Sequence, residues 1–228
     1  EVYDAIAERL TKPDFRPRAL FERFNIEVLA TTEYPLDPLE SHARLAADGW
    51  GDRVVTTFRP DDLVDFEWAG WADRVAALGD LTGEDSTTYD GFLAALRARR
   101  LAFIEAGATS SDHGHPTAAT LDLAHDEAAT LFGKGLSGTA DARDAEAFRA
   151  HMLVAFAAMS IDDGLVMQLH PGATRNQNRW LHSTHGRDTG GADLTLPSAA
   201  IEVAAMRVRR RTSSSSIVGD PLTGTSPQ

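Results

Sequence analysis

The hydrophobic pattern of this 228-residue chain predicts four β-strands separated by helices. Short apolar runs of strand character lie at residues 25–32, 53–58, 108–111 and 165–169, and each run ends in polar or ionisable residues. Between them, apolar residues recur at helical spacing over residues 38–48, 67–78, 88–105, 117–131 and 141–160. This alternation predicts an α/β fold with a parallel sheet and right-handed crossovers.

The residues that follow the strands are where we expect function. Parallel strands joined by helices expose their carboxyl ends on one side of the sheet, so one pocket can collect side chains from several strands. Arg59 follows the second strand, His113 and His115 follow the third, and His170 follows the fourth. Arg175 comes shortly after His170 and is followed by amide side chains, and such groups suit hydroxyls and a carboxylate.

Each of these residues also has a structural interpretation. Arg59 could form an ion pair with Asp61 or with the aspartate after it. His113 and His115 stand at alternate positions, so they could bind one metal ion. Alternatively, they could form local hydrogen bonds within a turn. His170 could be a core histidine whose hydrogen bonds are satisfied. The sequence contains neither a Gly-rich phosphate loop nor a nucleophile elbow, which disfavours phosphoryl transfer and serine hydrolysis.

Composition restricts the partners and the compartment. The formal net charge of −12 argues against a nucleic acid or an anionic membrane as partner, because phosphate binding needs clustered Lys and Arg. No stretch is long and apolar enough for a membrane span, and the chain has no cysteine, so the cytoplasm is the expected compartment. Arg97, Arg99 and Arg100 in the helix over residues 88–105 are expected to face solvent.

Five separated motifs resemble the uronate isomerase (glucuronate isomerase) family of the amidohydrolase superfamily, and they occur in the family's order over roughly residues 1–197. The motifs are FRPRALF at residues 15–21, NIEVLATT at residues 25–32, TFRPD at residues 57–61, SDHG at residues 111–114, and MQLHPGA at residues 167–173 with Arg175 and Asn176.

The resemblance implies a (β/α)8 TIM barrel that interconverts D-glucuronate and D-fructuronate, or D-galacturonate and D-tagaturonate. This aldose–ketose isomerisation passes through an enediol-like intermediate and uses a divalent metal, often zinc. It also implies substrate-binding positions for Arg59, His113, His170 and Arg175, with the Arg59 guanidinium meeting the uronate carboxylate. The partner is thus a small hexuronate; a homo-oligomer is left open, and no catalytic residue is assigned.

The chain departs from the family pattern in ways that predict a central fragment. The family's metal pair on its first barrel strand and the aspartate ligand on its last strand have no counterpart in this sequence, so no metal ligand is assigned here. We therefore expect a partial TIM-barrel domain of about four strands with inserted helices over residues 1–197, and a divergent, disordered tail over residues 198–228. Isomerase activity is expected to be impaired. The alternatives are a metal-dependent hydrolase using His113, His115 and His170, and an inactive remnant or assembly partner.

Overall fold

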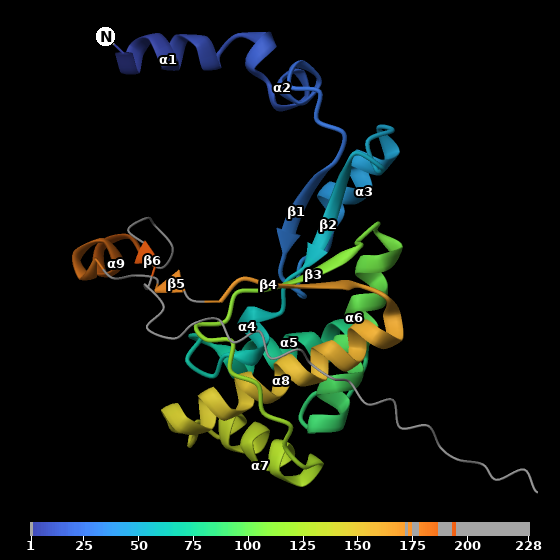
Figure 1. Ribbon diagram of the computed structural model, residues 1–228, viewed down its shortest axis with the longest axis vertical. Helices are drawn as coiled ribbons and strands as arrows, with labels where there is room; N and C mark the ends of the chain where they lie inside the picture. The colour runs from blue at the N-terminus through green and yellow to red at the C-terminus, as the bar shows by residue number, and fades with distance from the viewer. Residues whose placement is uncertain (1, 172, 175–177, 187–192, 195–228) are drawn as a thin grey trace, which may run out of the picture. The chain divides into compact units, whose positions relative to one another are not determined.

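The computed structural model describes residues 2–171, 173–174, 178–186 and 193–194. Four strands form one sheet: β1 (Leu29–Glu33), β2 (Val54–Phe58), β3 (Ser110–His113) and β4 (Val166–Leu169). They are hydrogen-bonded in the order β1-β2-β3-β4, and each neighbouring pair is parallel (Figure 1). The α/β class and the four predicted strands are confirmed, although the first strand begins at Leu29 instead of residue 25.

The two faces of the sheet have different neighbours. Alternate residues of a strand point to opposite faces. Phe58 of β2 packs on Phe103 and Phe156, which lie on helices, with ring centroids 5.1 and 6.4 Å away. Thr57 points to the other face, where its hydroxyl lies 3.4 Å from a serine hydroxyl of β3. Helices therefore cover the face that carries Phe58, and Arg59, two residues after Thr57, belongs to the opposite face.

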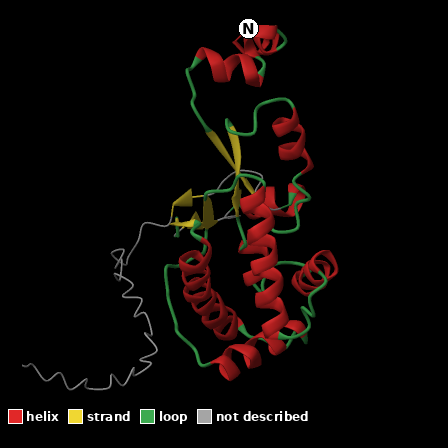
Figure 2. Cartoon of the chain, turned by 90° about the vertical axis from the view of Figure 1, so that its right-hand side faces the viewer, coloured by secondary structure: helices red, strands yellow, loops and turns green. Residues whose placement is uncertain are grey.

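Helices connect the strands (Figure 2). They also supply most of the core residues. After β1 comes α3 (Glu40–Ala47), after β2 come α4 (Asp61–Val64), α5 (Trp71–Thr82) and α6 (Tyr89–Glu105), and after β3 come α7 (His125–Leu136) and α8 (Ala142–Asp163). The fully buried side chains at the centre include Phe58, Leu63, Leu78, Phe92, Leu96, Phe103, Phe148, Met152 and Phe156.

The ends of the two longest helices follow from local sequence. The Thr88 hydroxyl accepts a hydrogen bond from the Gly91 N–H at 3.1 Å and so caps the start of α6. The Asp141 carboxylate caps α8 by accepting two backbone hydrogen bonds from the first turn, each 2.8 Å long. Gly164 adopts a φ of 82° and ends α8.

The helix predicted over residues 117–131 begins only at His125, so that prediction was wrong for its first turns. The backbone N–H of Leu121 donates to the Ala150 carbonyl at 3.2 Å, and the N–H of Leu123 donates to Nδ1 of His151 at 3.2 Å. Nε2 of His151 lies 2.8 Å from the Tyr89 hydroxyl. Because these backbone N–H groups donate to acceptors on α8, the segment before His125 forms a loop instead of a helix.

The prediction that all three arginines of α6 face solvent was also wrong. The Arg100 side chain is fully buried; its Nε and Nη2 donate to the Asp163 carboxylate at 2.5 and 2.9 Å, and Nη2 also donates to the Ser160 hydroxyl at 2.9 Å. Arg99 donates to two backbone carbonyls of the loop that precedes α3. Arg97 is about half exposed, as expected.

Further elements lie at the two ends of the described chain. The helices α1 (Val2–Leu10), η1 (Pro13–Phe15) and α2 (Pro17–Arg23) precede the sheet, and the short elements β5 (Ala173–Thr174), α9 (Arg179–His185) and β6 (Asp193–Leu194) follow it. The predicted boundary between residues 197 and 198 lies outside the described residues and stays a prediction. Within the described part, no helix combines the length and the apolar character that a membrane span requires.

Candidate active site

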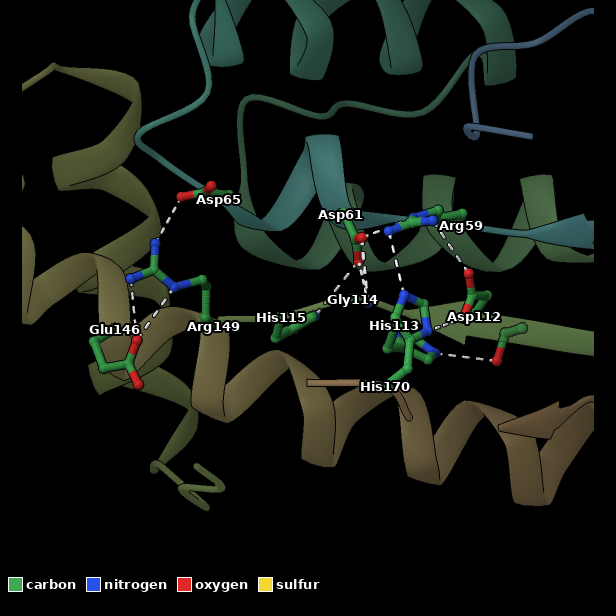
Figure 3. Close-up of polar contacts among 11 residues, drawn as sticks. Arg59, Asp61, Asp65, Asp112, His113, Gly114, His115, Glu146, Arg149 and His170 are labelled. Carbon is green, nitrogen blue, oxygen red and sulfur yellow. Dashed lines mark hydrogen bonds and ion pairs between the residues drawn. The ribbon is translucent and has the colours of Figure 1, made fainter. Parts of the chain in front are cut away.

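The carboxyl ends of β2, β3 and β4 bring together a polar cluster that we call the strand-end cluster: Arg59, Asp61, Asp112 and His170 (Figure 3). Arg59 and His170 each extend the sheet by one hydrogen bond beyond its strand. The Arg59 N–H donates to the Glu33 carbonyl at 2.9 Å, and the His170 N–H donates to the His113 carbonyl at 3.1 Å. The backbone ladder thus fixes the two side chains next to each other.

The Arg59 guanidinium is the centre of the strand-end cluster. Its Nε donates to Asp61 Oδ2 at 2.8 Å, its Nη1 lies 3.4 Å from Asp112 Oδ2, and its Nη2 lies 3.5 Å from His170 Nε2. Burial by itself would lower the pKa of Arg59, but the carboxylates of Asp61 and Asp112 outweigh it and raise the pKa. Arg59 therefore stays a cation, and Nη2 is the nitrogen without a carboxylate partner among the described residues.

Asp112 holds His170 as well as Arg59. Its Oδ1 lies 2.6 Å from His170 Nδ1, and its side chain is 10% exposed, whereas the His170 side chain is 47% exposed. The exposure contradicts the interpretation of His170 as a core histidine. With neutral His170, one guanidinium and two carboxylates give the strand-end cluster a formal charge of −1.

Gly114 and Asp61 lock the loop after β3 onto the strand-end cluster. The Gly114 N–H donates to both carboxylate oxygens of Asp61, at 3.1 and 3.2 Å. A Cβ on Gly114 would lie 2.4 Å from Arg59 Nη2 and 2.8 Å from His170 Nε2, so only a residue without a side chain fits here. Sequence reasoning did not single out Asp112 and Gly114 as site residues, although both stand in the SDHG motif.

His113 lies outside the strand-end cluster, and His115 reaches it only at Asp61, whose Oδ1 lies 3.9 Å from His115 Nε2. The next residue after Asp112 points to the other face of β3, where the His113 imidazole is 1% exposed and packs 5.0 Å from the Phe156 ring. Its Nε2 lies 3.1 Å from the Ser111 hydroxyl, and its centroid lies 6.0 Å from that of His115. The two histidines line a cavity of about 10 Å³, which has no room for a sugar acid. A substrate-binding role for His113 stays a prediction that this geometry does not favour.

The buried imidazole of His113 makes stability sensitive to acid. Burial, with contributions from His115 and Arg100, lowers the pKa of His113 from 6.5 to about 3. Between these values the unfolded chain binds a proton that the folded chain refuses, so stability falls as the pH falls. From roughly pH 6.5 to pH 5, we expect His113 alone to remove about 2 kcal/mol of unfolding free energy.

Urea unfolding of the wild type and of His113→Gln across this pH range measures the effect. The two proteins share Asp62, whose pKa burial raises to about 6 and which acts in the opposite direction, so the difference between the curves isolates His113. Lost contacts of the substituted side chain shift the whole curve without changing its slope. Parallel curves for the two proteins would contradict the expectation.

Arg175 lies outside the described residues, so its place in the site stays a prediction. Among the described residues, no group of three or more His, Asp or Glu side chains is placed to hold a metal ion. His113 and His115 face the helices, whereas His170 lies with Arg59 on the other side of β3, so these three histidines do not form one ligand set.

Comparison with known proteins gives a consistent result. The model of the glucuronate isomerase family matches residues 1–207 of this chain. The chain belongs to the glucuronate isomerase family. A uronate isomerase of Rhizorhabdus wittichii is 58% identical over 205 residues, which is 90% of this chain and 43% of that relative. A uronate isomerase of Xanthomonas oryzae pv. oryzae is 57% identical over 194 residues, or 85% of this chain and 41% of that relative.

Solved structures of the glucuronate isomerase family share the fold. The crystal structure of glucuronate isomerase from Caulobacter crescentus matches with a TM-score of 0.79 and 50% identity, over 84% of this chain and 40% of that one. Uronate isomerase from Thermotoga maritima matches with a TM-score of 0.76 and 32% identity, over 80% and 41%. These matches confirm the partial TIM barrel with inserted helices. The chain spans about two fifths of the length of these relatives.

Proposed function

We propose that this chain serves the aldose–ketose isomerisation of hexuronates such as D-glucuronate and D-galacturonate. One observation carries the proposal: at the strand ends of a chain from the glucuronate isomerase family, the cationic Arg59 presents Nη2 beside the exposed imidazole of His170. A guanidinium nitrogen binds a carboxylate oxygen, and an imidazole binds or moves the proton of a neighbouring hydroxyl. Together the two side chains match the acid group of a uronate and the hydroxyls beside it.

The proposed carboxylate contact is weaker than a free arginine would give. Asp61 and Asp112 already engage Nε and Nη1, so a uronate oxygen meets Nη2 alone instead of two parallel donors. The excess negative charge of the strand-end cluster also opposes an anion. We therefore expect an affinity near the millimolar range, about −4 kcal/mol of binding free energy.

The metal that the resemblance implies does not fit the described donors. Asp61, Asp112 and His170 are the side chains of the strand-end cluster that could bind a metal. Asp61 and Asp112 are paired with Arg59, and His170 is paired with Asp112. We derive no chemical step through a metal from this chain, and we propose that the chain alone has little or no isomerase activity. The metal-dependent hydrolase alternative is not favoured, because its three histidines lie apart. A cytoplasmic location stays part of the proposal.

An assembly role is the second candidate, and exposed edge strands favour it. Within the described residues β1 pairs only with β2, and β4 pairs only with β3. Leu29, Val166 and Leu169 on these edge strands are 45%, 64% and 50% exposed. Unpaired strand edges with apolar residues are templates for further strands. Light scattering shows whether the chain associates.

Binding of glucuronate to an arginine variant tests the proposed function. In Arg59→Met we expect the affinity for glucuronate to fall about tenfold, because the one charge-assisted hydrogen bond to the carboxylate is lost. Two-dimensional NMR titration of the 228-residue chain measures it. Arg18→Met is the matched control, since Arg18 lies on the exposed helix α2 and pairs with Asp48 far along the chain. Equal affinity of wild type and Arg59→Met, or equal binding of glucuronate and uncharged glucose, would refute the proposed function.

A further inference from the structure

The imidazole of His170 stands between a carboxylate and a cation, and this arrangement dictates where its hydrogen lies. Asp112 Oδ1 can only accept a hydrogen bond, so at 2.6 Å the facing Nδ1 of neutral His170 carries the hydrogen. Nε2 is then left with a lone pair. The Arg59 Nη2 donor at 3.5 Å faces that lone pair, which agrees with the same tautomer. Nε2 has only one lone pair, so a substrate hydroxyl that donates to it takes the place of this long contact with Nη2.

We propose that Asp112 and His170 form an acceptor for the hydroxyl on the carbon next to the substrate carboxylate, so that the site selects the open-chain form of a uronate over its ring form. The inference rests on the proposed function, in which Arg59 binds the carboxylate. Asp112 is a positioning residue here: it touches no substrate and acts by fixing the tautomer and orientation of His170.

The chemistry of uronates makes such an acceptor selective. In the open-chain form the oxygen next to the carboxylate-bearing carbon is a hydroxyl, which donates a hydrogen bond. In the pyranose form the same atom is the ring oxygen, which has no hydrogen and can only accept. The lone pair of Nε2 therefore accepts a hydrogen bond from the hydroxyl and stabilises the open chain. It cannot bond to the ring oxygen, because both atoms are acceptors. Isomerisation needs the open-chain carbonyl, so this preference serves the reaction.

The distances at the strand ends suit this recognition. Arg59 Nη2 and His170 Nε2 are 3.5 Å apart. The hydroxyl and the carboxylate of an α-hydroxy acid sit on neighbouring carbons, so hydrogen bonds of about 2.9 Å from the two nitrogens can reach both groups of one molecule. The absent side chain of Gly114 lets both nitrogens take these positions, since a Cβ there would lie within 3.0 Å of each.

Three carboxylates that differ in the oxygen on the carbon next to the carboxylate test the inference. D-Gluconate is an open chain with a hydroxyl next to its carboxylate, 2-deoxy-D-gluconate lacks that hydroxyl, and a methyl D-glucopyranosiduronate is locked in the ring form. Binding to the 228-residue chain is followed by NMR titration at about pH 8.5, above the range in which free imidazole titrates. We expect gluconate to bind about tenfold more tightly than either of the other two.

Asp112→Asn is the decisive variant. Asp112 Oδ2 faces Arg59 Nη1 at 3.4 Å, so the replacement amide keeps its oxygen toward that donor and turns its NH₂ toward His170 Nδ1. The imidazole hydrogen then moves to Nε2, and the acceptor becomes a donor. All three ligands bind more tightly because a negative charge is gone. The preference for gluconate over the ring-locked glucuronide disappears, because the ring oxygen can accept from the new donor, whereas the preference over 2-deoxygluconate is kept, because a hydroxyl also accepts.

Asp61→Asn is the matched control. It removes the same charge from beside Arg59, while the contacts of Asp61 run to Arg59, Gly114 and His115 and leave His170 alone. The three carboxylates should also bind more tightly to Asp61→Asn, and this variant should keep the tenfold preference for gluconate. The ¹⁵N shifts of the His170 ring provide a second readout that a structural role would not move: they report hydrogen on Nδ1 in the wild type and in Asp61→Asn, and on Nε2 in Asp112→Asn.

The outcomes separate this inference from the proposed function. Three results overturn the inference and leave the carboxylate site intact: equal binding of gluconate and 2-deoxygluconate to the wild type, an unchanged preference of Asp112→Asn for gluconate over the ring-locked glucuronide, or hydrogen on Nε2 in the neutral wild-type ring. Equal binding of gluconate and uncharged sorbitol overturns the proposed function, and the inference with it.

Discussion

Replacing Arg100 with methionine is expected to lower the free energy of unfolding by about 3 kcal/mol. Arg100 is fully buried, and two of its nitrogens hold the Asp163 carboxylate at the end of α8. Arg100→Met leaves this carboxylate, 13% exposed, without its counter-charge in a site that water reaches poorly. It also removes the guanidinium that lies 5.5 Å from the Phe58 ring centroid. Urea unfolding followed by circular dichroism measures the change.

Arg97→Met provides the matched control for Arg100. Arg97 lies one turn earlier on α6 and faces Asp162 at 3.9 Å, with both side chains about half exposed or more. Exposed ion pairs of this kind contribute between 0 and about 1 kcal/mol, so this variant should unfold nearly like the wild type. A similar loss for the two variants would mean that the charge of α6 as a whole, and not the buried pair, supports the fold.

Gly114→Ala is expected to abolish the carboxylate site while the fold survives. The added methyl group would lie 2.4 Å from Arg59 Nη2 and 2.8 Å from His170 Nε2, so both side chains must move away. Both are the far ends of movable side chains, which keeps the cost in stability small, on the order of 1 kcal/mol. The contacts to the carboxylate and to the neighbouring hydroxyl, about tenfold each, are lost together, so gluconate binding should fall about a hundredfold.

NMR titration with gluconate and urea unfolding of Gly114→Ala measure the two effects separately. Gly133→Ala is the matched control, because Gly133 lies on α7 with no atom near enough to contact an added methyl group. There the alanine should raise stability by up to about 1 kcal/mol, since alanine favours a helix more than glycine does. Gluconate binding by Gly114→Ala at the wild-type affinity would show that the methyl group fits and that the close approach is not needed.

The strands and the neighbours of the site could be predicted because they depend on local sequence. Runs such as Val54–Phe58 have few alternatives to a buried strand, and the polar residue after such a strand must lie at the sheet edge. That reasoning placed Arg59 and His170 at the same edge of the sheet, at the ends of the second and fourth strands. It could not choose between Asp61 and Asp62 as the partner of Arg59, because that choice depends on the direction of α4. In the structure the buried Asp62 carboxylate accepts a hydrogen bond from Arg74 Nη1 at 2.7 Å.

The errors have physical causes as well. Arg100 shares a helical face with the apolar residues Leu96 and Phe103, so its spacing could have indicated burial. Its charge argued for solvent, and the partner that makes burial possible, Asp163, is distant in sequence. The loop before α7 has helix-forming residues, but its backbone donors bond to α8. Tertiary contacts overrode local preference in both cases.

The strand register of β3 sets the chemistry on both sides of the sheet. Asp112 holds His170 on one face, while the next residue, His113, packs against Phe156 on the other. A slip by a single residue would turn the Asp112 carboxylate into the aromatic core and the His113 imidazole toward Arg59 and His170. β3 shares one registered pair with β2 and four with β4, so the pairing with β4 sets the position of Asp112. Insertions in β3 or β4 should therefore be far less tolerated than insertions in the loops that follow them.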